Sequence, residues 1–176
     1  NKYLEEFRLA SLGWKAFSLG VLDDVETYVN TAGDIEVVIV DEAHRFRNQD
    51  TESYEKLRNI CRGKKVILLT ATPFNNRPSD IFSLLKLFLL PKQSTITLDN
   101  NLKGIFDSYK KVFDQLSYIK RYHDSVDKEK IKRASVYYKI LFGEKAFDLK
   151  EVRKRSHLLA SHIRHTIAPI TIRRNR

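Results

Sequence analysis

The chain has 176 residues, of which 42% are hydrophobic, and this composition suits a folded domain and excludes a disordered tail. Its longest apolar runs, VVIV and LFLL, are far shorter than the roughly 20 residues that a membrane-spanning helix needs, and nothing at the N-terminus resembles a signal peptide. We therefore expect a cytoplasmic protein with no membrane contact. The single cysteine, Cys61, excludes an internal disulfide and is expected to be a buried or half-buried structural thiol.

Basic residues outnumber acidic residues by 32 to 22, and the excess is concentrated near the C-terminus. Between Lys150 and Arg176 there are eight basic residues and one acidic residue. Such a cluster is typical of a surface that binds a phosphate backbone. The alternative is a solvated helix face beside an acidic neighbouring domain. The candidates for nucleic-acid contact are Arg153, Lys154, Arg155, Arg173 and Arg174.

The first part of the chain alternates between helix and strand patterns. Apolar spacing predicts helices over 1–12 and 21–29 and strands over 15–19 and 35–40. The segment at 35–40, IEVVIV, is apolar on both faces. A strand of this kind is usually a central strand of a parallel sheet.

A helix and a second strand follow. Helical spacing predicts a helix over 51–61, capped by Asp50 or Thr51 and ended by Gly63. The segment VILLT at 66–70 is then a second strand that is apolar on both faces. Strand, helix and strand at this spacing predict a βαβ unit with two neighbouring parallel strands and a right-handed crossover.

Helices dominate the rest of the chain. Ser79 or Asp80 can cap a helix that ends before Pro91. The elements predicted after a polar connector are a long helix over 102–119, a charged linker over 123–133, helices over 134–143 and 148–167, and a short strand over 170–172.

Two carboxylates, Asp41 and Glu42, directly follow the first of the two apolar strands. The carboxyl ends of parallel strands are the places where α/β proteins bind ligands. One carboxylate can hold Mg²⁺ there, usually through water, while its neighbour orients or deprotonates an attacking water. The alternative is a pair of solvent-facing acids that ends a strand and has no chemical role.

Thr70 and Thr72 have the same relation to the second strand, so we expect their hydroxyls at the same edge of the sheet. Their short side chains could hydrogen-bond to the two carboxylates or to His44, and this segment could then sense whether a phosphate site is filled. The alternative is a turn that a threonine hydroxyl stabilises ahead of Pro73.

The combination of DEAH with a following LTATP resembles motifs II and III of superfamily-two helicases and translocases, whose motor consists of two RecA-like domains. Longer segments resemble the Swi/Snf-type DNA-dependent ATPases in particular. These segments are DEAHRFRN at 41–48, LTATPFNN at 69–76, DIFSLLKLFLLP at 80–91 and IAPITIRRNR at 167–176. The resemblance covers 37–91 and 158–176, and the motifs are highly specific in this order.

The resemblance implies an α/β fold in which a partial RecA-like parallel sheet with flanking helices carries a mostly helical insertion. It divides the chain into three parts. Residues 1–95 would be the C-terminal part of the first RecA-like domain, residues 96–157 the helical insertion, and residues 158–176 the return to the RecA-like domain.

The resemblance also implies roles for individual residues. Asp41 would bind Mg²⁺ through water, Glu42 would activate water for ATP hydrolysis, and His44 would couple motif II to motif III. The residues that would link hydrolysis to movement on nucleic acid are Thr70, Ala71 and Thr72. The implied cofactors are ATP and Mg²⁺, and the implied partner is nucleic acid, with double-stranded DNA as the expected track.

The phosphate-binding loop of such motors, G-x-x-x-x-G-K-[ST], does not occur in the sequence. The chain begins without a methionine and ends without the composition of a tail, so we expect a fragment. The P-loop segment would lie upstream, and the second RecA-like domain, with a closing arginine, would lie downstream. Because Mg²⁺ is usually held by one or two carboxylates together with substrate phosphates, the fragment alone is expected to be inactive.

Two other functions remain open. The motor subunit of a restriction system also uses DEAHR and TATP, although it is less expected to contain LLKLFLLP or the terminal RR. A non-enzymatic helical module that binds nucleic acid through residues 100–176 is the other alternative. Its binding would weaken steeply with salt and would be unaffected by Asp41→Asn.

Overall fold

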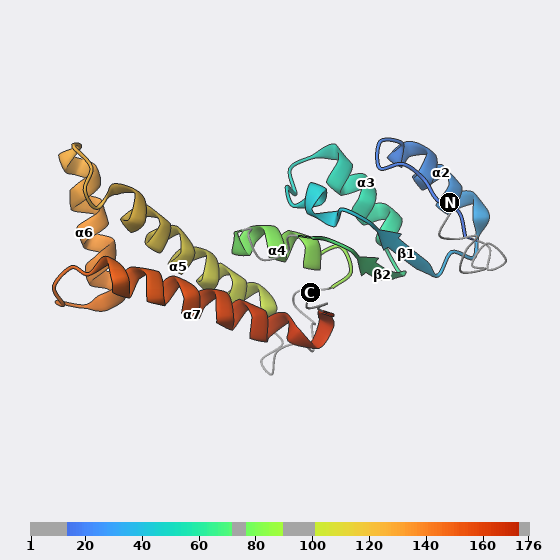
Figure 1. The fold of residues 1–176 in the computed structure, drawn as a ribbon. Coiled ribbons are helices and arrows are strands. Elements are labelled where there is room, and N and C mark those ends of the chain that lie inside the picture. Colours follow the sequence, from blue (N-terminus) through green and yellow to red (C-terminus); the bar gives the residue numbers. More distant parts are fainter. Residues whose placement is uncertain (1–13, 72–76, 90–100, 173–176) are drawn as a thin grey trace.

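The computed structural model describes residues 14–71, 77–89 and 101–172. The molecule is elongated, with a small α/β unit at one end and an arm of long helices at the other, and helix α4 lies between them (Figure 1). The helix expected over 1–12 lies outside the described residues. No helix in the described ranges is long and apolar enough to cross a membrane.

The α/β unit is built on two parallel strands, as the sequence predicts. Strand β1 (Val37–Val40) pairs with β2 (Lys65–Leu68), with Val37 opposite Lys65 and Val40 opposite Leu68. Helix α3 (Glu52–Cys61) connects the strands and packs against α2 (Leu22–Ala32). The expected α/β character is therefore present, in a sheet of two strands within the described residues.

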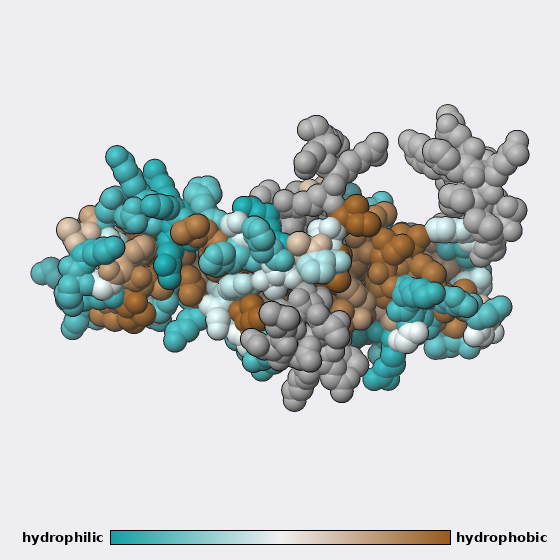
Figure 2. Space-filling view, turned by 90° about the horizontal axis from the view of Figure 1, so that it is seen from below, coloured by the Kyte–Doolittle hydropathy of each residue, from teal (hydrophilic) through white to brown (hydrophobic). Residues whose placement is uncertain are grey.

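The two faces of the sheet have different environments. Val38, Val40, Val66 and Leu68 belong to the hydrophobic cluster that includes residues of α2 and α3. On the other face, Val37, Ile39, Ile67 and Leu69 remain between 39% and 48% exposed. The view in Figure 2 shows hydrophobic surface over the half of the molecule that contains the sheet. The sequence predicts a sheet that is buried on both faces, but within the part of the chain that the structure describes only one face is covered.

The prediction of a strand over 15–19 is wrong. These residues have no regular secondary structure, and they contact α2 through side chains. The ring of Phe17 lies 5.3 Å from that of Tyr28, and Nζ of Lys15 lies 4.1 Å from the centre of the Tyr28 ring. A strand needs backbone hydrogen bonds to a neighbouring strand, and β1 pairs with β2 alone in the described sheet.

Helix α3 begins and ends where its sequence signals predict. The hydroxyl of Thr51 accepts a hydrogen bond from the backbone N–H of Tyr54, and Gly63 follows the helix at a φ of 72°. Cys61 is buried on the inner face of the helix. Burial raises the pKa of the Cys61 thiol to about 11, so the side chain is a neutral packing group at physiological pH.

Helix α4 (Pro78–Leu85) begins earlier than expected. Its N-cap is Arg77, neither Ser79 nor Asp80, because Pro78 occupies the first helical position, where proline needs no hydrogen-bond donor. The carboxylate of Asp80 instead accepts a hydrogen bond from the backbone N–H of Arg77 at 3.3 Å. Aspartate at this position still stabilises the helix start, but from the third helical residue.

The helical arm consists of α5 (Leu102–Tyr122), α6 (Lys128–Phe142) and α7 (Leu149–Ile167), with α5 packed against both of the others. The charged linker is shorter than predicted, because the carboxylate of Asp127 caps α6 by accepting hydrogen bonds from the backbone N–H groups of Glu129 and Lys130. The expected strand over 170–172 is also wrong. Residues 168–170 form a 3₁₀ turn, η3, that continues from α7.

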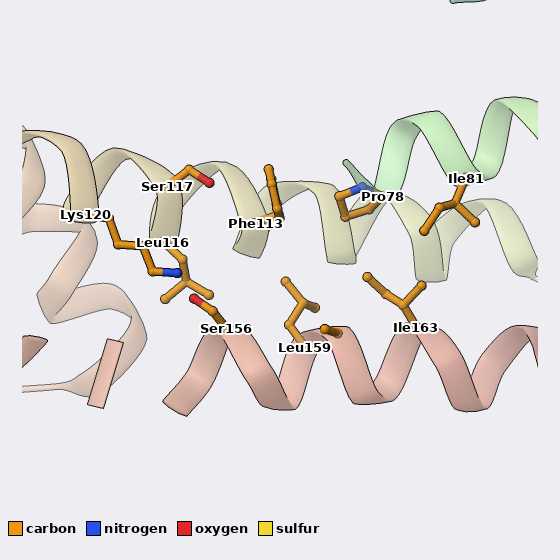
Figure 3. Close-up of a pocket in the computed structure, with 10 residues that line it drawn as sticks. Pro78, Ile81, Phe113, Leu116, Ser117, Lys120, Ser156, Leu159 and Ile163 are labelled. Atoms are coloured by element: carbon orange, nitrogen blue, oxygen red, sulfur yellow. The ribbon is translucent and has the colours of Figure 1, made fainter. Parts of the chain in front are cut away.

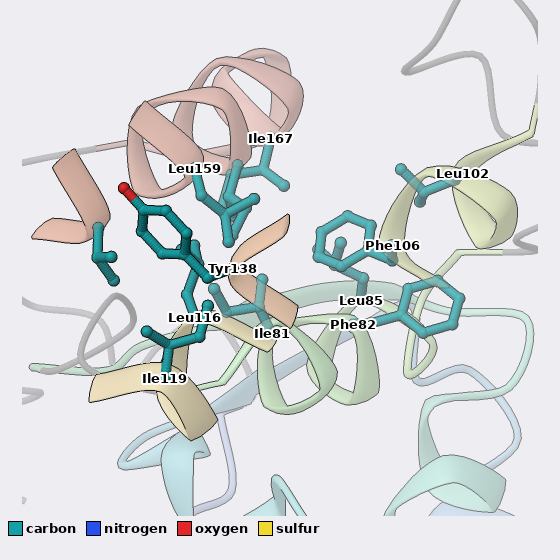
Figure 4. Packing of buried hydrophobic residues seen from close by; sticks show 12 residues of the cluster. Ile81, Phe82, Leu85, Leu102, Phe106, Leu116, Ile119, Tyr138, Leu159 and Ile167 are labelled. Atoms are coloured by element: carbon teal, nitrogen blue, oxygen red, sulfur yellow. The ribbon is translucent and has the colours of Figure 1, made fainter. Parts of the chain in front are cut away.

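Helix α4 contributes to both hydrophobic clusters found among the described residues. Ile81, Phe82 and Leu85 pack with residues of α5, α6 and α7, including Phe106 (Figure 4). Leu84, on an adjacent flank of the same helix, packs with residues of the α/β unit. The arm is therefore joined to the sheet through one short helix.

We predict that Phe106→Ala lowers the free energy of unfolding by about 3–5 kcal/mol, because Phe106 is buried and its ring lies 5.2 Å from that of Phe82. Phe147→Ala is the matched control. It should cost about 1 kcal/mol or less, because Phe147 is half exposed. Urea unfolding followed by circular dichroism measures both values, and equal losses would contradict the packing described for α4 and α5.

Candidate functional site

The acidic pair lies at the carboxyl end of β1, and backbone hydrogen bonds hold it beside the second motif. The N–H of Leu69 donates to the carbonyl of Val40 at 2.8 Å, and the N–H of Ala43 donates to the carbonyl of Leu69 at 2.9 Å. Leu69 is thus bonded on both sides of Asp41 and Glu42. The chain then continues directly into Thr70.

Glu42 turns the chain away from the strand. Its backbone adopts a left-handed conformation, with a φ of 49° and a ψ of 40°, which residues other than glycine rarely adopt. Its N–H donates to Oδ1 of Asp41 at 2.8 Å. The 3₁₀ helix η2 (Ala43–Phe46) starts immediately afterwards. Its residues Ala43 and Phe46 are buried, so they anchor the turn in the core and leave both carboxylates exposed to solvent.

His44 lies against the second carboxylate of the pair. Its Nδ1 atom is 3.1 Å from Oε2 of Glu42, which is an ion-pair distance when the imidazole is protonated. The same Nδ1 atom is buried, and the geometry to Glu42 is not that of a hydrogen bond. His44 is therefore placed to influence the position of the Glu42 side chain.

The structure brings the first and second motifs together as expected, for the residues that it describes. Thr70 is half-buried and Ala71 is exposed, and both follow the Leu69 hydrogen bonds at the edge that carries the acidic pair. Thr72 lies outside the described residues. The roles of these side chains in catalysis and coupling stay predictions.

The basic candidates lie away from the acidic pair. Arg153, Lys154 and Arg155 are exposed in the first half of α7, at the end of the arm farthest from β1 (Figure 1). Arg173 and Arg174 lie outside the described residues. Consecutive helix residues point about 100° apart, so the three arginine and lysine side chains do not form one row. Lys154 and Arg155 line a shallow cleft with Glu151, whereas Arg153 lies near Lys120 of α5.

A polar network that the sequence motifs do not reveal links the loop after η2 to α4. The side-chain amide of Gln49 donates to the hydroxyl of Ser83 at 2.6 Å, and Nζ of Lys86 donates to the Gln49 carbonyl oxygen at 2.8 Å. The hydroxyl of Tyr54 donates to the backbone carbonyl of Ser83 at 2.8 Å. Burial, together with Arg58 and Lys103, lowers the pKa of Lys86. These partners are far apart in sequence, so local sequence patterns do not predict the hydrogen bonds between them.

The acidic pair suits a Mg²⁺ ion that takes most of its ligands from elsewhere. Within the described residues, no group of three or more histidine, cysteine, aspartate or glutamate side chains could hold a metal by itself. Mg²⁺ does not need such a cage, because it binds through one or two carboxylates, water and substrate phosphates. The exposed carboxylate of Asp41, oriented by the Glu42 N–H, fits this requirement.

Comparison with known proteins agrees with the arrangement of these motifs. Residues 18–174 match the SNF2-related domain, so the chain belongs to this family. The match spans the acidic pair, the Thr70 segment and all three helices of the arm.

Several curated proteins are similar to parts of the chain. An uncharacterized ATP-dependent helicase of Bacillus subtilis, YqhH, is 48% identical over 52 residues, which are 30% of this chain and 9% of the relative. ATP-dependent helicase fft1 of Schizosaccharomyces pombe is 37% identical over 75 residues, 43% of this chain and 7% of the relative. Chromodomain-helicase-DNA-binding protein 1-like of Danio rerio is 25% identical over 126 residues, 72% of this chain and 11% of the relative.

The chain spans less than a tenth of the length of the first two of these relatives. No solved structure matches it.

We predict that Glu42→Gly is more stable than Glu42→Ala by about 1 kcal/mol. Both variants lack the carboxylate, but glycine adopts the left-handed backbone of residue 42 without the steric cost that a Cβ atom imposes. Thermal and urea unfolding of the two variants measures the difference. An alanine variant as stable as the glycine variant would show that residue 42 does not need the left-handed conformation.

Proposed function

We propose that the chain is part of the first RecA-like domain of an ATP-dependent motor that moves on double-stranded DNA. The observation that carries this proposal is the pair of Leu69 hydrogen bonds, which hold Asp41, Glu42 and Thr70 side by side at the carboxyl ends of two parallel strands. Ligand sites of α/β proteins occur at this edge. Membership of the SNF2-related domain family supports the same function.

In this proposal each residue of the edge has a separate task. Asp41 would hold Mg²⁺ through water, and the bound ion would neutralise the negative charge of the phosphates. Glu42 accepts a proton from the attacking water or orients it. His44, 3.1 Å from Glu42, links the carboxylate to the following motif. The residues that connect hydrolysis to DNA movement are Thr70, Ala71 and Thr72.

The groups that hold ATP phosphates come from another part of the whole protein. The 176 residues contain no P-loop, and the two carboxylates of the edge repel phosphate in the absence of a bound cation. We therefore propose that residues 1–176 alone do not hydrolyse ATP. An upstream P-loop segment and a downstream second RecA-like domain complete the nucleotide pocket.

The helical arm carries the proposed contacts to DNA. Residues 102–172 include sixteen basic and eight acidic side chains, whereas residues 14–71 include eight basic and ten acidic ones. Positive charge is thus segregated to the arm, and this distribution favours binding of a phosphate backbone there. The proposed contact residues are Arg153, Lys154, Arg155, Arg173 and Arg174.

We predict that Glu42→Gln in the whole protein lowers kcat for ATP hydrolysis at least about 100-fold, because an amide cannot accept the proton of the attacking water. ATP binding should remain within about twofold of wild type. Glu36→Gln is the matched control, since Glu36 is exposed at the opposite end of β1 and should leave kcat unchanged. A phosphate-release assay and equilibrium nucleotide binding measure the two quantities.

Retention of wild-type kcat by Glu42→Gln would contradict the catalytic role. Turnover by residues 1–176 alone would contradict the need for the P-loop, particularly if Glu42→Gln abolished it.

We predict that replacing Arg153, Lys154 and Arg155 with alanine weakens DNA binding equally for different DNA sequences. The dependence of log K on log salt should become shallower by about 0.9 for each lost phosphate contact. Fluorescence anisotropy with labelled duplex DNA across a salt series measures the slope. Lys110→Ala combined with Lys111→Ala, which removes two exposed cations from α5, is the control. Equal effects of both sets would mean that net charge alone, without a defined surface, governs binding.

A further inference from the structure

A cavity lies at the junction where α4, α5 and α7 meet, and the proposed motor function does not use it. Its volume is about 90 Å³, and ten side chains from the three helices line it (Figure 3). Its wall is mainly aliphatic and aromatic, with Phe113 and Leu116 on α5 and Leu159 and Ile163 on α7. Helix α4 contributes Ile81.

The cavity has one apolar end and one polar end. Pro78, Ile81 and Ile163 lie together at one end, and Lys120, Ser117 and Ser156 lie at the other (Figure 3). Lys120 and Ser117 are exposed, so the polar end opens to solvent. A ligand group that enters from this side reaches hydrophobic surface after it has passed a lysine.

The volume limits what can enter. An enclosed apolar cavity of about 150 Å³ accommodates benzene. At about 90 Å³, this cavity is smaller than that and has room for a short aliphatic side chain. Its opening beside the exposed end of α5 allows such a side chain to come from another polypeptide.

The charge at the opening selects for an acidic neighbour. Partial burial of its ammonium group and the positive charge of Arg153 both lower the pKa of Lys120, so the lysine at the opening has a cationic neighbour. The arm around the cavity has twice as many basic as acidic residues. A carboxylate at the opening would relieve the repulsion between Lys120 and Arg153.

We propose that this cavity is an anchor site for an acidic peptide segment of a partner protein, with one valine, leucine or isoleucine side chain in the cavity and a neighbouring carboxylate paired with Lys120. A few side chains buried in well-packed pockets usually carry most of the binding energy of an interface. The site lies where the arm joins α4, so an occupant would contact all three helices that meet there.

The test is selection of a random peptide phage library on the full-length protein. We expect enrichment of peptides that carry an aspartate or glutamate next to a single valine, leucine or isoleucine. A selected peptide is then synthesised with a fluorescein label. Its binding should weaken at least tenfold in Ala160→Leu, which fills the cavity, and at least tenfold in Lys120→Gln, which removes the charge at the opening of the cavity.

Two matched variants serve as controls. Ser161→Leu adds the same side chain one residue further along α7 but outside the cavity, and Lys111→Gln removes an exposed charge elsewhere on α5; both should bind the peptide as wild type does. Circular dichroism establishes that each variant is folded, and Lys120→Gln, which leaves the cavity wall intact, keeps the test valid if Ala160→Leu does not fold.

Three outcomes would overturn the proposal. The first is the absence of enrichment, and the second is enrichment of peptides that lack an acidic residue next to an aliphatic one. The third is selected peptides whose affinity neither Ala160→Leu nor Lys120→Gln changes. If Lys120→Gln weakens duplex DNA binding and no peptide is enriched, Lys120 belongs to a phosphate-binding surface instead. None of these outcomes depends on ATP hydrolysis, so failure here is distinguishable from failure of the proposed motor function.

Discussion

The backbone hydrogen bonds of Leu69 are the constraint on which the candidate site depends. They extend the parallel pairing of β1 and β2 by one residue and close around the acidic pair. The left-handed turn at Glu42 is possible in this position because Ala43 and Phe46, which follow it, are buried in the core and fix the position of the backbone. The energetic cost of the unfavourable backbone conformation at residue 42 is offset by packing a few residues later, and the carboxylates remain accessible to solvent.

Helix α4 has a second structural role, because it joins the site to the arm. Its residues pack into two different hydrophobic clusters, and Ser83 of the helix and its C-cap residue Lys86 bond to Gln49, which follows the η2 turn. A displacement of the η2 turn would therefore have to move or break contacts of α4. The same helix also contributes to the cavity of the proposed anchor site, so the edge that carries the acidic pair, the arm and that cavity meet at this helix of eight residues.

Local signals predicted those elements whose start and end depend on nearby residues. The helix α3, with its Thr51 cap, and the helix α7, with its Asp148 cap, form as expected, because capping hydrogen bonds join residues two or three positions apart. The errors have a common cause. A strand over 15–19 would need a distant pairing partner. The charge of 123–133 predicts a linker, whereas the carboxylate of Asp127 starts α6 within that segment. Side-chain composition alone decides neither case.

By itself the sequence determined the order of the motifs, the parallel strands that carry Asp41, Glu42 and Thr70, and the concentration of positive charge toward the C-terminus, because these features depend on residue type and local spacing. Only the tertiary structure decided which residues meet across long separations. It joined Gln49 to Ser83 and Lys86 by hydrogen bonds, brought Arg153 near Lys120 of α5, and left one face of the sheet open within the described residues. Such contacts arise from the packing of whole helices against one another, and no short stretch of sequence encodes that packing.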